Sequence, residues 1–136
     1  MIGSGKQLSA LIGVISVLAN GTSFAAVGKA ELDGAMRHAE EEYKVARLAP
    51  RALVTQHMSR LLDLRREIEK LDVVGSCQGT RQVYAATVGS WVSNMRLAML
   101  SPEASALLSG SDLAKEGDAN FERHRRSEKC LPLPDK

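Results

Sequence analysis

The stretch AELDGAMRHAEEEYKVARLA, residues 30–49, places an apolar side chain at every third or fourth position. Its apolar seam consists of Leu32, Met36, Ala39, Tyr43 and Ala46. This alternation is typical of an α-helix that buries one face. It points Met36 inward and His38 toward solvent. The pattern therefore predicts a helix over residues 30–48, which ends before Pro50 because a helix interior does not tolerate proline.

Three more helical segments follow along the chain. Residues 50–72 carry a seam of Val54, His57, Leu61, Leu64, Ile68 and Leu71. Residues 77–100 carry a seam of Tyr84, Val88, Trp91, Met95 and Ala98. Residues 102–129 are less regular, with a shared face formed by Leu113, Gly117, Phe121 and His124. In the SPE sequence, Ser101 is suited to be an N-cap and Pro102 the first helical residue.

The resulting fold prediction is all-α, an antiparallel up-down four-helix bundle behind an N-terminal signal peptide. No alternating β-branched run competes with this interpretation. The sequence leaves open whether the last helix is continuous through Gly110. If it breaks there, Ser111 or Asp112 is placed to cap a second piece.

The first 25 residues have the three parts of a signal peptide. Lys6 supplies a basic start, residues 8–19 are apolar, and small residues follow at Ser23 and Ala25. We expect cleavage after Ala25 and export to a bacterial periplasm, the alternative being an uncleaved membrane anchor. The apolar run is short for a transmembrane span, so no stable membrane insertion is expected after cleavage. The predicted layout is a signal peptide over 1–25, a bundle over 26–130 and an extended tail over 131–136.

The mature chain has little net charge. Removing residues 1–25 from the 136 leaves 111 and takes away one lysine, so that 17 basic and 16 acidic residues give a net charge of +1. This balance predicts no nucleic-acid partner and no anionic membrane surface.

The two cysteines, Cys77 and Cys130, predict one disulfide, because an even pair in an exported chain is usually oxidised. Cys77 opens the third segment and Cys130 follows the fourth. In two neighbouring antiparallel helices these two ends lie close together, so the geometry allows a disulfide between them.

The sequence does not predict an enzyme. It contains no G-x-S-x-G nucleophile elbow, no glycine-rich phosphate loop and no C-x-x-C pair. It also lacks the C-x-x-C-H motif of covalent haem and the Glu-x-x-His pairs of di-iron bundles. The histidines and methionines remain, and their simplest roles are a hydrogen-bonded core histidine at His57, a basic helix end at His124 and flexible core packing by Met36.

The first helix resembles that of the cytochrome b562 family of soluble periplasmic b-type cytochromes. The resemblance lies in AELDGAMRHAEEEYKVA, where Met36 is followed seven residues later by the pair Tyr43-Lys44. It implies a four-helix bundle that holds haem b without covalent attachment and transfers electrons to a redox partner. It also implies that Met36 and His124 are the axial ligands of the haem iron. His124, followed by Arg125 and Arg126, matches the family's ligand near the end of the last helix.

Physical reasoning is consistent with that assignment, because the start of the first helix and the end of the last lie at the same end of an up-down bundle. A thioether and an imidazole suit low-spin haem iron. Two alternatives stay open. One is a non-haem periplasmic bundle that binds another protein, for example as an envelope-stress or secretion accessory. The other is a transition-metal binder that uses His38, His57 or the methionines, although these histidines do not recur at ligand spacing.

Overall fold

The first helix of the computed structural model, α1 (Lys29–Arg47), matches the segment predicted from residues 30–49. Its start is fixed by Glu31, whose carboxylate accepts a hydrogen bond from the Gly28 amide at 3.1 Å. Met36 is 1 % exposed and His38 is exposed, so the predicted facing of both side chains is confirmed. The structure describes residues 25–133, so most of the predicted signal peptide and the end of the tail lie outside it.

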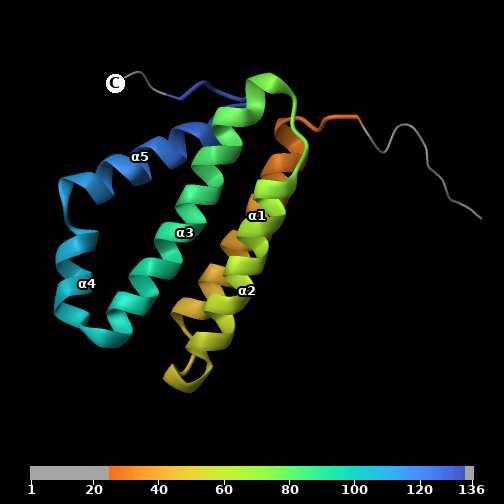
Figure 1. Ribbon diagram of the computed structural model, residues 1–136. Coiled ribbons are helices and arrows are strands. Elements are labelled where there is room, and N and C mark those ends of the chain that lie inside the picture. The colour runs from red at the N-terminus through yellow and green to blue at the C-terminus, as the bar shows by residue number, and fades with distance from the viewer. Residues whose placement is uncertain (1–24, 134–136) are drawn as a thin grey trace, which may run out of the picture.

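Two further long helices pack beside α1 (Figure 1). They are α2 (Arg51–Lys70) and α3 (Gln78–Leu100), the latter preceded by the short 3-10 helix η2 (Gly75–Cys77). Pro50 directly precedes α2, and its φ of −59° suits the start of a helix. Within residues 25–133, β pairing is limited to an isolated parallel bridge between Val27 and Val73. The all-α prediction is therefore confirmed.

The core lies between these three helices. Its largest apolar side chains with less than 2 % exposure are Leu32, Met36, Leu61, Ile68, Tyr84, Val88 and Val92. They occupy the alternating positions on which the helices were predicted, except for Val92. His57 is also buried, as its seam position predicted.

The predicted fourth helix is two helices, α4 (Pro102–Ser109) and α5 (Asp112–Arg126), which we call the arm. Ser101 caps α4 by accepting a hydrogen bond from the Ala104 amide at 3.2 Å, as expected. Ser111 caps α5 in the same way through the Ala114 amide at 3.2 Å. The chain thus breaks at Gly110, because Ser111 can begin a new helix there.

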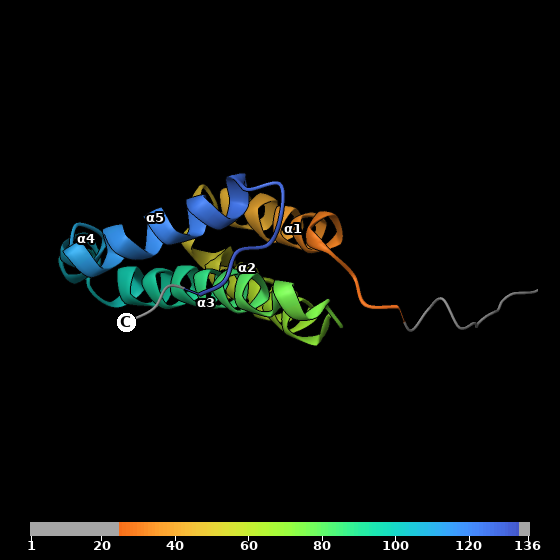
Figure 2. The same ribbon diagram turned by 90° about the horizontal axis from the view of Figure 1, so that it is seen from above.

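The arm does not lie along the whole length of α3. Figures 1 and 2 show α5 meeting α3 near the start of α3, whereas α4 lies near the end of α3. Leu113, at the beginning of α5, is 76 % exposed, so it does not share a buried face with Phe121 and His124. The molecule is therefore three long helices plus an angled arm.

Cys77 and Cys130 form the predicted disulfide, with 5.0 Å between their Cα atoms. The bridge ties the start of α3 to the segment after α5. Beyond it, the Leu131 amide donates to the Thr80 hydroxyl at 3.1 Å, so the tail continues along α3.

Removing the bridge is expected to destabilise the fold. The two cysteines are 53 positions apart, and a cross-link closing a loop of this length is worth about 4 kcal/mol in the chain-entropy model. The C77A/C130A variant should unfold at a lower urea concentration than the oxidised protein. A loss below about 1 kcal/mol would show that the unfolded chain gains little freedom when the bridge is absent.

Candidate functional site

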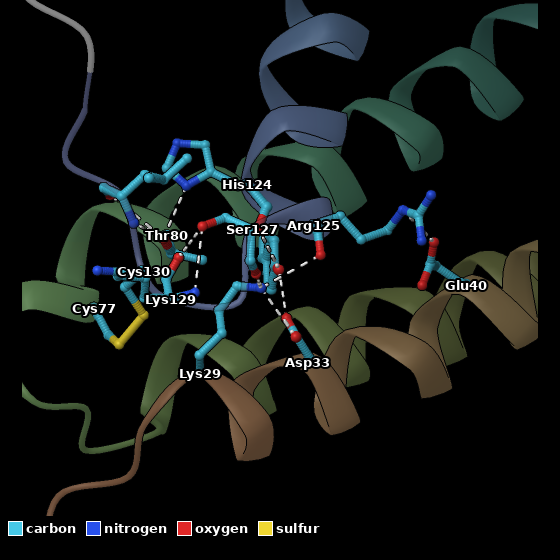
Figure 3. A network of polar contacts seen from close by, with 12 residues as sticks. Lys29, Asp33, Glu40, Cys77, Thr80, His124, Arg125, Ser127, Lys129 and Cys130 are labelled. Atoms are coloured by element: carbon cyan, nitrogen blue, oxygen red, sulfur yellow. Dashed lines mark hydrogen bonds and ion pairs between the residues drawn. A yellow bond between two sulfur atoms is a disulfide. The ribbon is translucent and has the colours of Figure 1, made fainter.

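The beginning of α1 meets the end of α5 through Lys29 (Figure 3). Its ammonium donates to the carbonyl oxygens of Ser127 at 2.5 Å and Arg125 at 3.4 Å, and to Asp33 at 3.0 Å. Carbonyls at a helix end lack partners within the helix and attract a cation. Lys29 is only 8 % exposed, so its charge is satisfied by these groups rather than by bulk water. The predicted meeting of the first and last helix ends is confirmed.

Asp33 links this contact to α3. The Tyr84 hydroxyl donates to the other carboxylate oxygen of Asp33 at 2.6 Å. Burial, together with the hydrogen bond to Asp33, raises the pKa of the Tyr84 phenol well above its usual range. Tyr84 therefore remains protonated and acts as a donor. We call Lys29, Asp33, Tyr84 and the last carbonyls of α5 the end clasp.

His124 lies beside the clasp and is completely buried. Its Nδ1 lies 2.8 Å from the Thr80 hydroxyl, while its Nε2 has no hydrogen-bond partner among the described residues. Burial, reinforced by the charges of Arg123 and Lys29, lowers the pKa of the imidazole. The ring is thus neutral at pH 7. If Nδ1 carries the proton and donates to Thr80, Nε2 presents a free lone pair.

Met36 and His124 are both buried, the first on α1 and the second on α5. Figure 3 shows the imidazole extending from α5 toward Thr80 and the tail, on the side away from Lys29 and Asp33 of α1. Met36 is buried on the core face of α1. Neither of the two hollows described below is lined by Met36 or His124. The free Nε2 suits a ligand, but neither of these hollows gives a haem access to both side chains.

The other two histidines are placed differently. His38 is exposed on α1. His57 Nδ1 lies 2.5 Å from a Glu42 carboxylate oxygen, which is also 3.7 Å from Arg60. His57 is therefore a hydrogen-bonded core histidine that joins α2 to α1. Over residues 25–133 the structure contains no group of three or more His, Cys, Asp or Glu side chains able to hold a metal ion.

The structure also contains two hollows that sequence reasoning missed. The larger, of about 900 Å³, runs between α3 and the arm, and we call it the arm groove. The smaller, of about 380 Å³, lies where the end of α1, the start of α2 and the end of α3 meet, and we call it the arginine pocket. Both hollows are lined by Tyr43, Arg47 and Asn94. No local sequence signal marks either hollow, since both depend on helix angles.

Comparisons with protein-family models, curated proteins and solved structures found no match for this chain. They do not place it among the b562 cytochromes, so that resemblance stays a prediction. None of the described helices is long and apolar enough to cross a membrane.

The buried imidazole of His124 should make stability depend on pH. Its pKa is lower in the folded protein than in the unfolded chain, where it is near 6.5. As pH falls through about 6.5, the unfolded chain takes up a proton that the folded one does not, so stability is full above that pH and declines below it. The free energy of unfolding, measured in urea at pH 7.5 and 5.5, should fall less for His124→Gln than for the original protein. Equal losses would mean that His124 does not set this dependence.

Proposed function

We propose that this protein is a non-enzymatic binding protein of the periplasm, which holds a helical segment of another exported protein in the arm groove. The observation that carries the proposal is the shape of the groove. Three long helices and an angled arm leave room beside α3 that a parallel fourth helix would fill. A partner helix lying there would complete the bundle, the groove-binding mode used by many helical domains.

The groove is closed at the end where α5 packs on α3, and α4 bounds it near the end of α3, where the Ser105 hydroxyl donates to Asn94 at 2.9 Å. At the closed end, Phe121 of α5 packs edge-on against Tyr84 and Trp91 of α3, with ring centroids 5.8 and 5.9 Å apart. Between these two contacts α5 and α3 diverge (Figure 1). A methyl group added at Gly117 would meet nothing within 4 Å, and Leu113 is largely exposed. Apolar side chains of a partner could bury themselves between Leu113 and Trp91.

The charges along the groove favour an occupant with an acidic side chain beside its apolar face. Arg47 and Arg65 line one side, and Asp118 lines the other. Arg65 reaches the groove by crossing Gly89, where an added methyl group would lie 3.0 Å from the guanidinium. Arg65 already pairs with Glu69 at 3.3 Å, so a carboxylate on the partner would pair first with Arg47, while a basic residue would suit Asp118.

The predicted signal peptide and the disulfide support placement in the periplasm. The apolar run over residues 8–19 follows Lys6 and precedes small residues. A disulfide is maintained where the surroundings are oxidising. Val27, the second residue after the predicted cleavage, pairs with the chain before α3 through Asp72 and Val74. Removal of the leader after Ala25 would leave this pairing intact.

Filling the groove should abolish partner binding without harming the fold. Gly117→Leu places an apolar side chain in open space and removes a helix glycine, which is worth about 1 kcal/mol in helix propensity. The variant should be at least as thermally stable as the original. Gly34→Leu is the matched control, because Gly34 lies on α1 outside the groove and an added methyl group would meet only the end of Arg37.

The measurement is cross-linking in the producing cells from a photoreactive residue at Ser90, which is exposed on the α3 wall. One protein should be captured, lost in the Gly117→Leu background and retained with Gly34→Leu. Capture that is equal in all three backgrounds would reject the groove as the binding site.

A second function, haem b binding with electron transfer, is favoured by one observation, the unpartnered Nε2 of buried His124. Ligation through Met36 as well would require the helices to repack, because neither hollow is lined by Met36 or His124. The protein should be exported with haem supplied, purified and examined by absorption spectroscopy.

If His124 holds haem, the spectrum should show a bound haem, and His124→Ala should remove it or change its spin state. Met36→Leu, which retains an apolar side chain of similar size, tests the second ligand. A colourless protein that takes up no added haemin would end this proposal.

A further inference from the structure

The arginine pocket shares Tyr43, Arg47 and Asn94 with the arm groove but is formed by different helix ends. It is bounded by the last turn of α1, the first turn of α2 and the last turns of α3. Its volume of about 380 Å³ lies within the range typical of small-molecule sites, near the lower end. The pocket is therefore of a size for one small ligand.

The floor of the pocket is apolar. Ala46 and Met95 are 3 % and 9 % exposed, and half-buried Val54, Ala98 and Met99 complete it. Methionine side chains adapt to ligands of different shape. Apolar surface of this kind gains free energy when a hydrocarbon displaces water from it.

Two guanidinium groups stand at the rim, and both are held by uncharged partners. Arg51 donates to the Met99 carbonyl at 2.8 Å, and Arg47 lies over the Tyr43 ring at 5.6 Å from its centroid. Neither makes an ion pair with a carboxylate anywhere in residues 25–133. The other described polar lining is the neutral amide of Asn94 and the hydroxyl of Tyr43.

The start of α2 adds to this positive potential. Arg51 is its first residue, and the first turn contains no acidic side chain and no side-chain cap. The positive end of a helix is normally balanced by such groups. The two arginines and this helix end therefore favour a negative charge at one edge of an apolar hollow.

We propose that the arginine pocket binds a small apolar carboxylate, with a hydrocarbon or aromatic body on the floor and the carboxylate at Arg47 and Arg51. Arginine pairs with carboxylates through two parallel hydrogen bonds, which gives both orientation and strength. A free inorganic anion would leave the apolar floor unused, and a neutral hydrocarbon would leave the arginines unpaired. Recognition requires both parts of the ligand in one molecule.

The chain contains its own reporter for this site. Trp91 is the single tryptophan of the sequence, and its ring stacks on Tyr43 with centroids 4.4 Å apart. Since Tyr43 lines the pocket, a ligand that moves it should change the fluorescence of Trp91. Octanoate and 3-phenylpropionate are suitable probes, used below the concentrations at which they aggregate.

The carboxylates should produce a saturable change, whereas acetate, phosphate and 1-octanol should bind at least tenfold more weakly. Arg51→Gln should weaken octanoate binding at least tenfold. Arg51→Lys should weaken it less, because lysine keeps the charge but lacks the planar guanidinium that forms two parallel hydrogen bonds with a carboxylate. Arg66→Gln is the matched control, since Arg66 is exposed on α2 and pairs with Asp63 outside the pocket. Thermal unfolding of each variant confirms that it is folded.

Equal affinity for octanoate and 1-octanol would overturn the proposal, as would an unchanged affinity in Arg51→Gln. Arg51 does not line the arm groove, so its loss tests this pocket separately from partner binding. Should Arg51→Gln be unfolded, amide shifts of Arg51 and Asn94 in the original protein decide the matter, because octanoate must perturb both and 1-octanol must not.

Discussion

The arrangement of this molecule depends on the buried ammonium of Lys29. A buried charge is costly unless it is fully paired, and Lys29 meets that requirement with one carboxylate and the two carbonyls at the end of α5. The same carboxylate accepts a hydrogen bond from Tyr84, so α1, α3 and α5 meet at one point. This contact fixes one end of the arm. The other end is set by the short helix α4 and the break at Gly110, and the angle between these two constraints produces the open groove.

Much of the fold could be predicted from local patterns. The seam of α1 placed Met36 inside and His38 outside, and the serines at 101 and 111 marked where helices could begin. The disulfide followed from the order of the segments. Each of these features depends on residues within a few turns of one another or on chain order alone, which is the information that a single sequence carries most directly.

The site was harder to predict because it depends on directions set by distant contacts. The imidazole of His124 is oriented by Thr80, 44 residues away, and by the tail that follows the disulfide. Nothing near His124 in the sequence indicates that direction. A lysine at the start of a helix normally faces solvent, so Lys29 gave no sign of its burial. The arm groove arises from the angle of the arm. The arginine pocket arises where α1, α2 and α3 meet, with its arginines held by uncharged groups. No local sequence pattern marks either arrangement.

The disulfide divides the molecule into two unequal parts. The bond between Cys77 and Cys130 closes a ring that contains α3 and the whole arm, while α1 and α2 lie outside it. A protease that cuts near Gly110 would leave both pieces joined, and the bundle could keep its shape. A cut at the turn before α2 would leave α1 held to the rest by packing, the bridge at Val27 and the clasp at Lys29 alone. The ring thus secures the α3 and arm walls of the arm groove, whereas the arginine pocket draws both of its arginines from α1 and α2, outside the ring.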